Sequence, residues 1–227
     1  MKKIILSLAL LAGFATGAHA QAGVKYGVKG GWNLATFSGT DSKGSGYKNG
    51  FSAGLALRFG FSDMIAITPE FLYSQKGATL DNFQLSSGSS VAKFKSTIGY
   101  LDVPVLLRVN TGEAGKGLFF ELGPQGSFLL HNRDFTQTGN ISTQSTDNTS
   151  TDDLNKVLIG YVGGLGYQLT SGLSLGVRYT GDFAQVYKDG ASRAYPIKAT
   201  ETRNGLNPNV HNSVFQFQVG YLFGSKG

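Results

Sequence analysis

The sequence of 227 residues contains no cysteine, which excludes disulfide bonds, thiolate metal sites and a lipid attached to an amino-terminal cysteine. Lysine and arginine exceed aspartate and glutamate by 20 to 14, but they are dispersed, and this pattern gives no indication of nucleic-acid binding. After the first 20 residues there is no apolar run of about 18 residues, the length that a transmembrane helix needs. No motif indicates a metal site or a cofactor, and we expect neither.

The first 20 residues are typical of a secretory signal peptide. Lys2 and Lys3 precede a short apolar run that begins at Ile4, and Ala18–Ala20 is a small-residue ending after which cleavage is expected. A membrane anchor is the alternative, which the shortness of the apolar run disfavours. We expect residues 21–227, which remain after cleavage, to form a single domain.

Glycine is abundant, with 33 residues against 5 prolines, and aromatic residues make up 12% of the chain. This composition is typical of tightly packed strands rather than of disorder. In Val157–Phe183 two runs of alternating apolar and polar residues flank the short polar connection Thr170–Gly172, the pattern of a β-hairpin. Each run reaches the roughly 9–11 residues that a tilted strand needs to cross a bilayer. The stretch therefore predicts a membrane-crossing hairpin.

Six further segments alternate in the same way: Val24–Thr36, Phe51–Phe61, Met64–Lys76, Phe94–Val109, Leu118–Leu130 and Ser213–Phe223. The connections alternate between short ones near Ser62, Thr111 and Ser171 and long ones at Thr36–Asn49, Gly77–Ala92, Asn132–Asp153 and Lys188–Val210. This sorting predicts an all-β fold, an eight-stranded antiparallel up-and-down transmembrane β-barrel with short periplasmic turns, long external loops and both termini in the periplasm of a bacterial cell.

Two details of this fold are also predicted. Pro69, Pro104 and Pro124 lie inside strands, where each removes a backbone donor, so we expect a local irregularity or bulge at each. The segment Thr136–Thr151 is low in complexity and nearly free of apolar residues, so we expect a mobile loop.

Two segments, Gly27–Ala35 and Tyr100–Arg108, resemble motifs of the PorT-like outer-membrane β-barrel family. Members of that family open with a glycine-rich strand that ends in asparagine, and carry a tyrosine-leucine-acid-apolar-proline strand near the middle. The resemblance implies an eight-stranded barrel in a bacterial outer membrane. It implies little about activity, although a few members are tied to protein secretion.

The alternation assigns the charged residues of the strands to one face and the aromatic residues to the other. An eight-stranded barrel is only wide enough for side chains to fill it, so we expect the charged face to form a salt-bridged lumen, with an ion path or binding site as the alternative. The predicted lumen set is Lys25, Lys29, Arg58, Lys76, Arg108, Arg178, Glu70, Asp102, Glu121 and Asp182. The aromatic residues near strand ends are expected to form interfacial girdles facing lipid, rather than the core of a soluble calyx: Tyr26, Trp32, Phe51, Phe59, Phe61, Tyr161, Tyr167, Phe183, Phe215, Tyr221 and Phe223.

An enzyme needs a nucleophile and a base, or paired acids, in one place. His131 and His211 are the histidines that remain after the signal peptide, each near the outer end of a strand. His131 could act with Asp134 or Asp153, but solvated histidines at the base of loops are the simpler interpretation. We expect the protein not to be an enzyme and assign no catalytic residue.

We therefore expect an outer-membrane β-barrel protein with a structural or surface-interaction role through its extracellular loops. A small passive porin, or a transport or secretion component, is the alternative. The expected partners are outer-membrane lipid, including lipopolysaccharide, and an unidentified protein or surface ligand at the loops. The loop Lys188–Val210 carries Arg193, Lys198 and Arg203, which are either ordinarily solvated or in contact with anionic lipopolysaccharide.

Overall fold

The computed structural model describes residues 24–84, 90–112, 115–138, 144–189 and 209–223. The predicted signal peptide, residues 1–20, lies outside these residues. The described part contains ten strands: β1 (Val24–Ser38), β2 (Lys48–Gly60), β3 (Ile65–Lys76), β4 (Thr79–Gln84), β5 (Ser90–Asn110), β6 (Gly117–Thr138), β7 (Gln144–Asn148), β8 (Val157–Gln168), β9 (Leu173–Asp182) and β10 (His211–Leu222).

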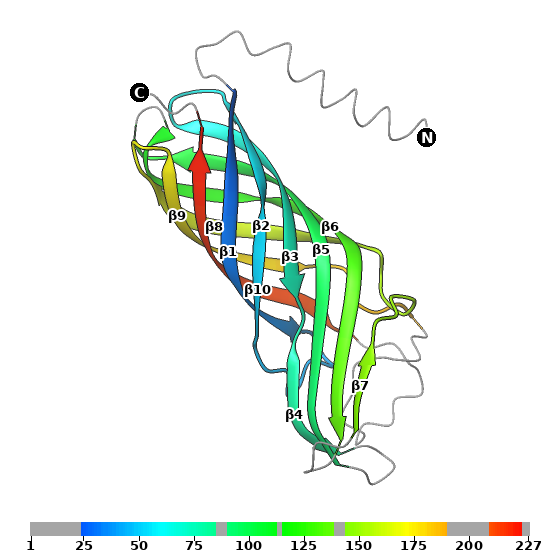
Figure 1. The fold of residues 1–227 in the computed structure, drawn as a ribbon. Helices are drawn as coiled ribbons and strands as arrows, with labels where there is room; N and C mark the ends of the chain where they lie inside the picture. The colour runs from blue at the N-terminus through cyan, green and yellow to red at the C-terminus, as the bar shows by residue number, and fades with distance from the viewer. Residues whose placement is uncertain (1–23, 85–89, 113–114, 139–143, 190–208, 224–227) are drawn as a thin grey trace.

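Eight of the strands form a closed ring with antiparallel neighbours (Figure 1). The ring runs β5-β3-β2-β1-β10-β9-β8-β6, and the pairing of β5 with β6 closes it. Closure gives every barrel strand a partner on both sides, so no backbone donors or acceptors are left at an open edge. The predicted eight-stranded antiparallel β-barrel is thus confirmed.

Side chains alternate between the two faces of the barrel wall, as the period of two predicts. In β5, for example, Leu107 is 52% exposed on the outside whereas Arg108 is 2% exposed in the lumen. All members of the predicted aromatic set lie on the outer side, where Trp32 stacks on Phe217 with ring centroids 5.5 Å apart. Apolar residues outside and polar residues inside exclude a soluble calyx, whose polarity would be the reverse.

The short connections lie at one end of the barrel, which we call the turn end, and the long connections at the other, the loop end (Figure 1). The amide of Phe223 donates to the carbonyl of Tyr26 at 2.8 Å, so the last and first described segments meet at the turn end. In the turn between β8 and β9, Gly172 has a φ of +93°, a conformation that favours glycine. Its carbonyl accepts a hydrogen bond from Leu222 at 2.9 Å.

The three strand prolines interrupt the ladders without shifting them. At each of Pro69, Pro104 and Pro124, two successive residue pairs between neighbouring strands are missing. The register of the two strands is the same before and after each gap. The predicted irregularities are confirmed as gaps in pairing, and the bulges expected there do not form, because a missing donor does not by itself require an extra residue.

A bulge occurs instead in β6. Gly99 pairs with His131 and Tyr100 with Leu129, which leaves Leu130 as the extra residue. Leu130 and His131 consequently both face outward. A β-carbon on Gly99 would lie 2.2 Å from Nε2 of His131, so the glycine is what allows the imidazole to lie across β5.

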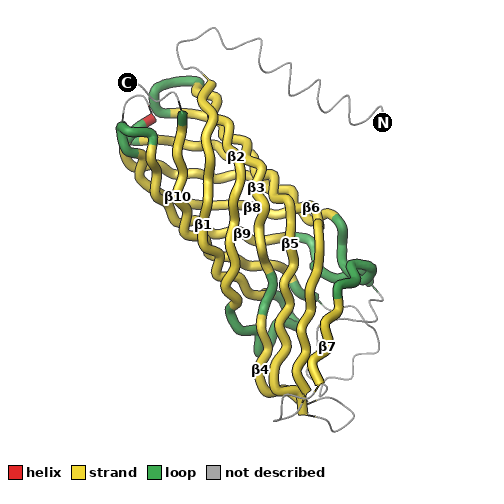
Figure 2. Tube along the Cα trace, in the orientation of Figure 1, coloured by secondary structure: helices red, strands yellow, loops and turns green. Residues whose placement is uncertain are grey.

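Strands β5 and β6 continue far beyond the loop end, flanked by β4 and β7 (Figure 2). The four strands form a sheet, β4-β5-β6-β7, which we call the extension. The prediction of open loops was wrong here, because Gly77–Ala92 contains β4 and Asn132–Asp153 contains β7. The predicted mobile loop Thr136–Thr151 is likewise strand wherever β6 and β7 include it.

The inner face of the extension covers an apolar cluster. Tyr100 and Leu158 belong to barrel strands and face inward, so this cluster fills the loop end of the lumen. Phe37 comes from the end of barrel strand β1, and the other members come from the extension and from the connections between strands. The buried residues of the cluster are Phe37, Ala78, Leu80, Phe94, Ile98, Tyr100, Leu154, Leu158, Val186, Tyr187 and Val210.

Candidate functional site

The centre of the lumen is filled by four charged side chains from four strands. Glu70 is fully buried and forms ion pairs with Lys29 and with Arg178, whose Nη1 lies 2.8 Å from its Oε2. Glu121 accepts a hydrogen bond from Nε of Arg178 at 3.0 Å and lies 3.9 Å from Nζ of Lys29. Two cations and two carboxylates thus compensate one another, as buried charges require.

A second group lies nearer the loop end. Nζ of Lys76 is 3.0 Å from Asp102 and 3.9 Å from Asp182, and it donates to Oγ of Ser127 at 3.0 Å. The same ammonium lies 5.0 Å from the centre of the Tyr100 ring, which belongs to the apolar cluster. The ionic and apolar fillings of the lumen are therefore in direct contact.

The turn end of the lumen contains two further cations, Arg58 and Arg108. Arg58 donates to the carbonyl of Gly115 and to Oδ1 of Asn110, both at 3.2 Å. Arg108 donates to the same Asn110 oxygen at 3.3 Å and to Gln168 at 3.0 Å. Through Gly115, the turn between β5 and β6 is attached to the barrel interior.

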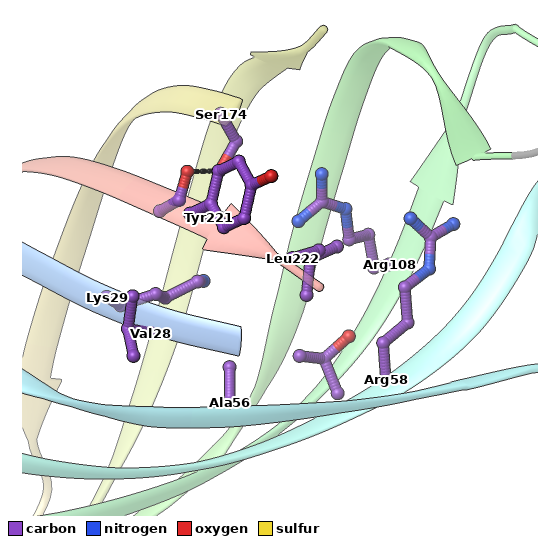
Figure 3. Close-up of a pocket in the computed structure, with 10 residues that line it drawn as sticks. Val28, Lys29, Ala56, Arg58, Arg108, Ser174, Tyr221 and Leu222 are labelled. Carbon is purple, nitrogen blue, oxygen red and sulfur yellow. Dashed lines mark hydrogen bonds between the residues drawn. The ribbon is translucent and has the colours of Figure 1, made fainter. Parts of the chain in front are cut away.

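A cavity of about 10 Å³ remains beside these arginines (Figure 3). Its walls include Lys29 of β1, Arg58 of β2, Arg108 of β5 and Leu222 of β10, which are labelled in Figure 3. This volume is close to the minimum that holds one water molecule. All ten residues of the predicted lumen set face inward, with Lys25 half-buried at the rim, and the predicted salt-bridged filling is confirmed.

His131 and Asp134, one of the pairs considered for an enzyme, lie on opposite faces of the sheet. Nε2 of His131 is hydrogen-bonded to the hydroxyl of Tyr73 at 2.9 Å on the outer surface, whereas the Asp134 carboxylate lies on the inner side of the extension and accepts from Asn132 at 2.8 Å. Burial raises the pKa of Asp134. His211 is hydrogen-bonded through its two ring nitrogens to Ala184 and Asn209.

The outer face of the extension carries a group of basic residues that sequence patterns did not single out. Lys93, Lys95 and Arg133, with Thr97 and Phe135, line a hollow of about 460 Å³. The two lysines continue the outward alternation of β5 and could have been found from it. Arg133 could not, because the bulge in β6 reverses the alternation beyond Leu130.

Ionic contacts show how the basic face is balanced. Arg133 pairs with Asp147 at 2.9 Å, and both side chains are largely exposed. Lys48 lies three residues beyond Phe51, an aromatic residue of the predicted interfacial girdle, and is 3% exposed. Burial lowers the pKa of Lys48 to about 8, and the positive charge of Lys95 is a smaller cause. The Arg133–Asp147 pair leaves Lys93 and Lys95 as the remaining cations that line the hollow.

Among the residues that the structure describes, no group of three or more histidines and acids could hold a metal ion. In the same residues, no helix is long and apolar enough to cross a membrane.

Comparison with solved structures finds several bacterial surface proteins. Ail, the attachment invasion locus protein of Yersinia pestis, is 12% identical over 88% of this chain and 98% of its own, with a TM-score of 0.47. Neisserial surface protein A is 13% identical over 88% of this chain and 98% of its own, with a TM-score of 0.43. The N-terminal β-barrel domain of Pseudomonas aeruginosa OprF is 11% identical over 87% and 97%, with a TM-score of 0.34. None of the curated proteins matches the sequence.

A family model described as outer membrane protein beta-barrel domain matches residues 18–185. The match includes seven of the eight barrel strands, and β10 completes the ring beyond it. The protein is accordingly located in the bacterial outer membrane. Barrels of this kind have their short turns in the periplasm and their long loops at the cell surface. By this match, and in agreement with its closed eight-stranded ring, the chain belongs to the outer membrane protein β-barrel domain family.

Proposed function

We propose that the protein is a closed, non-conducting barrel that interacts with other molecules at the cell surface through its extension and extracellular loops. One observation carries this proposal: the lumen is filled along its length. Ion pairs occupy its centre, the apolar cluster occupies its extracellular end, and the β5–β6 turn is hydrogen-bonded to Arg58 at its periplasmic end. A passive porin needs a continuous path of water, which this filling opposes.

Single-channel recording on purified protein in planar bilayers tests the closed lumen. We expect no discrete conductance steps. Reproducible steps that change size in Lys76→Met, within the lumen, but not in Arg133→Gln, on the outer surface, would establish the porin alternative. The second variant is the matched control, because each substitution removes one positive charge.

Lipopolysaccharide is the surface partner that the outer face of the extension favours. This face continues the lipid-facing wall of β5 and β6 immediately outside the aromatic residue Tyr73, at the level of lipid headgroups. Lys93, Lys95 and Arg133 lie together on this face, and the carboxylate of Asp147 pairs with Arg133. Cations in this position complement the phosphate groups of the outer leaflet.

Binding of phosphorylated lipopolysaccharide to the detergent-solubilised protein tests this partner. The triple variant Lys93→Gln, Lys95→Gln, Arg133→Gln should bind at least tenfold more weakly, while dephosphorylated lipopolysaccharide should not distinguish it from the wild type. Lys43→Gln, an exposed lysine in the loop after β1, is the control. Equal binding by the triple variant and the control would remove this partner from the proposal.

The second expected binding region, Lys188–Val210, lies mostly outside the described residues. Its two ends are structural: the Lys188 amide donates to the Asp153 carbonyl, and the fully buried Val210 accepts from Val186 at 2.9 Å. A deletion test should therefore replace residues 190–208 alone with a short glycine-serine linker. Loss of binding to cells or to surface ligands, with the fold intact, would support a role for this loop.

Two finer statements belong to the same proposal. The motifs Gly27–Ala35 and Tyr100–Arg108 lie in β1 and β5 and support membership of the PorT-like group. Membership of that group predicts that loss of the gene causes a defect in protein secretion, which a secretion assay would detect. We also propose that the protein is not an enzyme, because His131 and His211 are engaged in structural hydrogen bonds. Turnover of phospholipid or peptide substrates that His131→Ala abolishes would contradict this.

A further inference from the structure

The charges of the lumen do not balance within the membrane-spanning strands. Apart from Lys48, which lies beyond the aromatic residue Phe51 at the first position of β2, five buried cations face four buried carboxylates there, an excess of one positive charge. The cations are Lys29, Arg58, Lys76, Arg108 and Arg178, and the carboxylates are Glu70, Asp102, Glu121 and Asp182. Burying a charge without a partner is costly, so the position of the excess matters.

The excess lies at the periplasmic end. In the described residues, neither Arg58 nor Arg108 forms a salt bridge, although they are 6% and 2% exposed. Glu121 is the register partner of Arg108, but its carboxylate is bound to Arg178 instead. Lys25, the cross-strand neighbour of Arg58, adds a further positive charge at the rim.

The two guanidinium groups converge on one neutral acceptor. Both donate to Oδ1 of Asn110, at 3.2 and 3.3 Å, which holds two like charges close together. A guanidinium has five N–H donors, and the hydrogen bonds named above engage two on each arginine. The pair therefore offers both charge and donors to an additional acceptor.

The cavity beside the arginines supplies the place. Its volume of about 10 Å³ suits a single small particle, and Thr68 lines it together with Arg58, Arg108 and Lys29. Thr68 is 2% exposed, and its Oγ1 has no hydrogen-bond partner among the described residues. A buried hydroxyl without a partner costs free energy, whereas a hydroxyl that donates to an anion does not.

We propose that this cavity binds one monoatomic anion, chloride in the cell, between Arg58, Arg108, Lys29 and the hydroxyl of Thr68. One negative charge neutralises the excess of the lumen, and the four side chains come from β1, β2, β3 and β5, so the ion connects half of the barrel wall. A chloride ion is wider than a water molecule, so its binding requires the side chains around the cavity to move apart slightly. Sulfate, phosphate and carboxylates would need a much larger displacement. The site is separate from the surface binding proposed above, and neither depends on the other.

Thermal unfolding of the full chain in detergent, at constant ionic strength, tests the site. We expect the Tm in sodium chloride or bromide to exceed that in sodium gluconate or isethionate, by roughly 3 °C for each tenfold increase of halide above its Kd. In crystals grown with bromide, anomalous density should lie in the cavity.

Thr68→Val separates binding from a general salt effect, because it removes the hydroxyl at nearly constant volume. The variant should lose at least half of the halide-dependent shift in Tm. Ser52→Ala, which removes another buried and unpartnered hydroxyl at a site that does not line the cavity, should retain it. Equal Tm values in all four salts, an undiminished halide shift in Thr68→Val, or bromide density confined to other sites would each overturn the proposal.

Discussion

Replacing Glu70 with glutamine tests whether the ionic centre of the lumen stabilises the barrel as the geometry implies. Glu70 is 0% exposed and forms ion pairs with both Lys29 and Arg178. Glutamine keeps the size of the side chain but removes its charge, which leaves the two cations to share Glu121. Removing one partner of a buried ion pair costs about 3–5 kcal/mol, and we expect the free energy of unfolding to fall by this amount.

An exposed ion pair of almost the same length provides the control. Arg133 and Asp147 are 2.9 Å apart, against 2.8 Å for Arg178 and Glu70, but their side chains are 64% and 47% exposed. Arg133→Gln should cost no more than about 1 kcal/mol, because water screens the pair. Since the distances match, the difference between the two variants reports the effect of burial.

Urea unfolding in phospholipid vesicles measures both values. Trp32 is the only tryptophan and faces lipid, so its fluorescence follows loss of the barrel wall. The double variant Glu70→Gln, Arg178→Met should recover part of the loss, because it also removes a buried cation left without its partner. Losses below about 1 kcal/mol in both single variants would refute the reasoning and indicate a hydrated lumen.

Three further results are expected. Burial raises the pKa of Asp134, so the folded state favours the protonated carboxyl group. Stability should therefore rise as the pH falls from neutral through that raised pKa towards the ordinary aspartate value. Asp134→Asn should abolish this pH dependence in thermal unfolding. Gly99→Ala should displace the imidazole of His131, seen as altered histidine chemical shifts, with a loss of stability below about 1 kcal/mol, because only the end of a flexible side chain must move. Arg58→Ala should weaken the attachment of Gly115, whose carbonyl then keeps only the hydrogen bond from Asn110, so trypsin should cut the β5–β6 turn faster than in the wild type; unchanged cleavage would contradict a contribution from Arg58.

The barrel could be predicted from the sequence because its signal is local. Alternation with a period of two assigns each side chain to a face without knowledge of any other strand, and this was enough to identify all eight barrel strands and the inward charges. The extension was missed for a physical reason. Its outer face is polar and its inner face is covered by connections between strands. Segments such as Thr136–Thr151 therefore lack the row of apolar, lipid-facing residues by which the barrel strands were identified.

The pairing of the charges could not be predicted. Glu70 and Arg178 are 108 residues apart and meet across the lumen, so their contact depends on the stagger of every strand between them. The bulge at Leu130 was equally hidden, since one extra residue reverses the faces beyond it while leaving composition unchanged. Arg133 illustrates the consequence, because a regular β6 would have directed it inward.

The outer surface of the membrane can be located on β5 by two independent criteria. Between Val109 and Leu101 the outward residues of this strand are apolar, and its inward residues include the charged Asp102 and Arg108. Between Thr97 and Lys93, beyond the loop end, the outward residues are polar, and Ile98 and Phe94 face inward. Water on the outer side, and an apolar cluster in place of ions on the inner side, account for that reversal. The reversal occurs at Gly99. The His131 ring lies over this glycine and is hydrogen-bonded to Tyr73, one of the outward-facing aromatic residues. Polarity and aromatic placement therefore assign the same boundary, and the extension begins where the lipid ends.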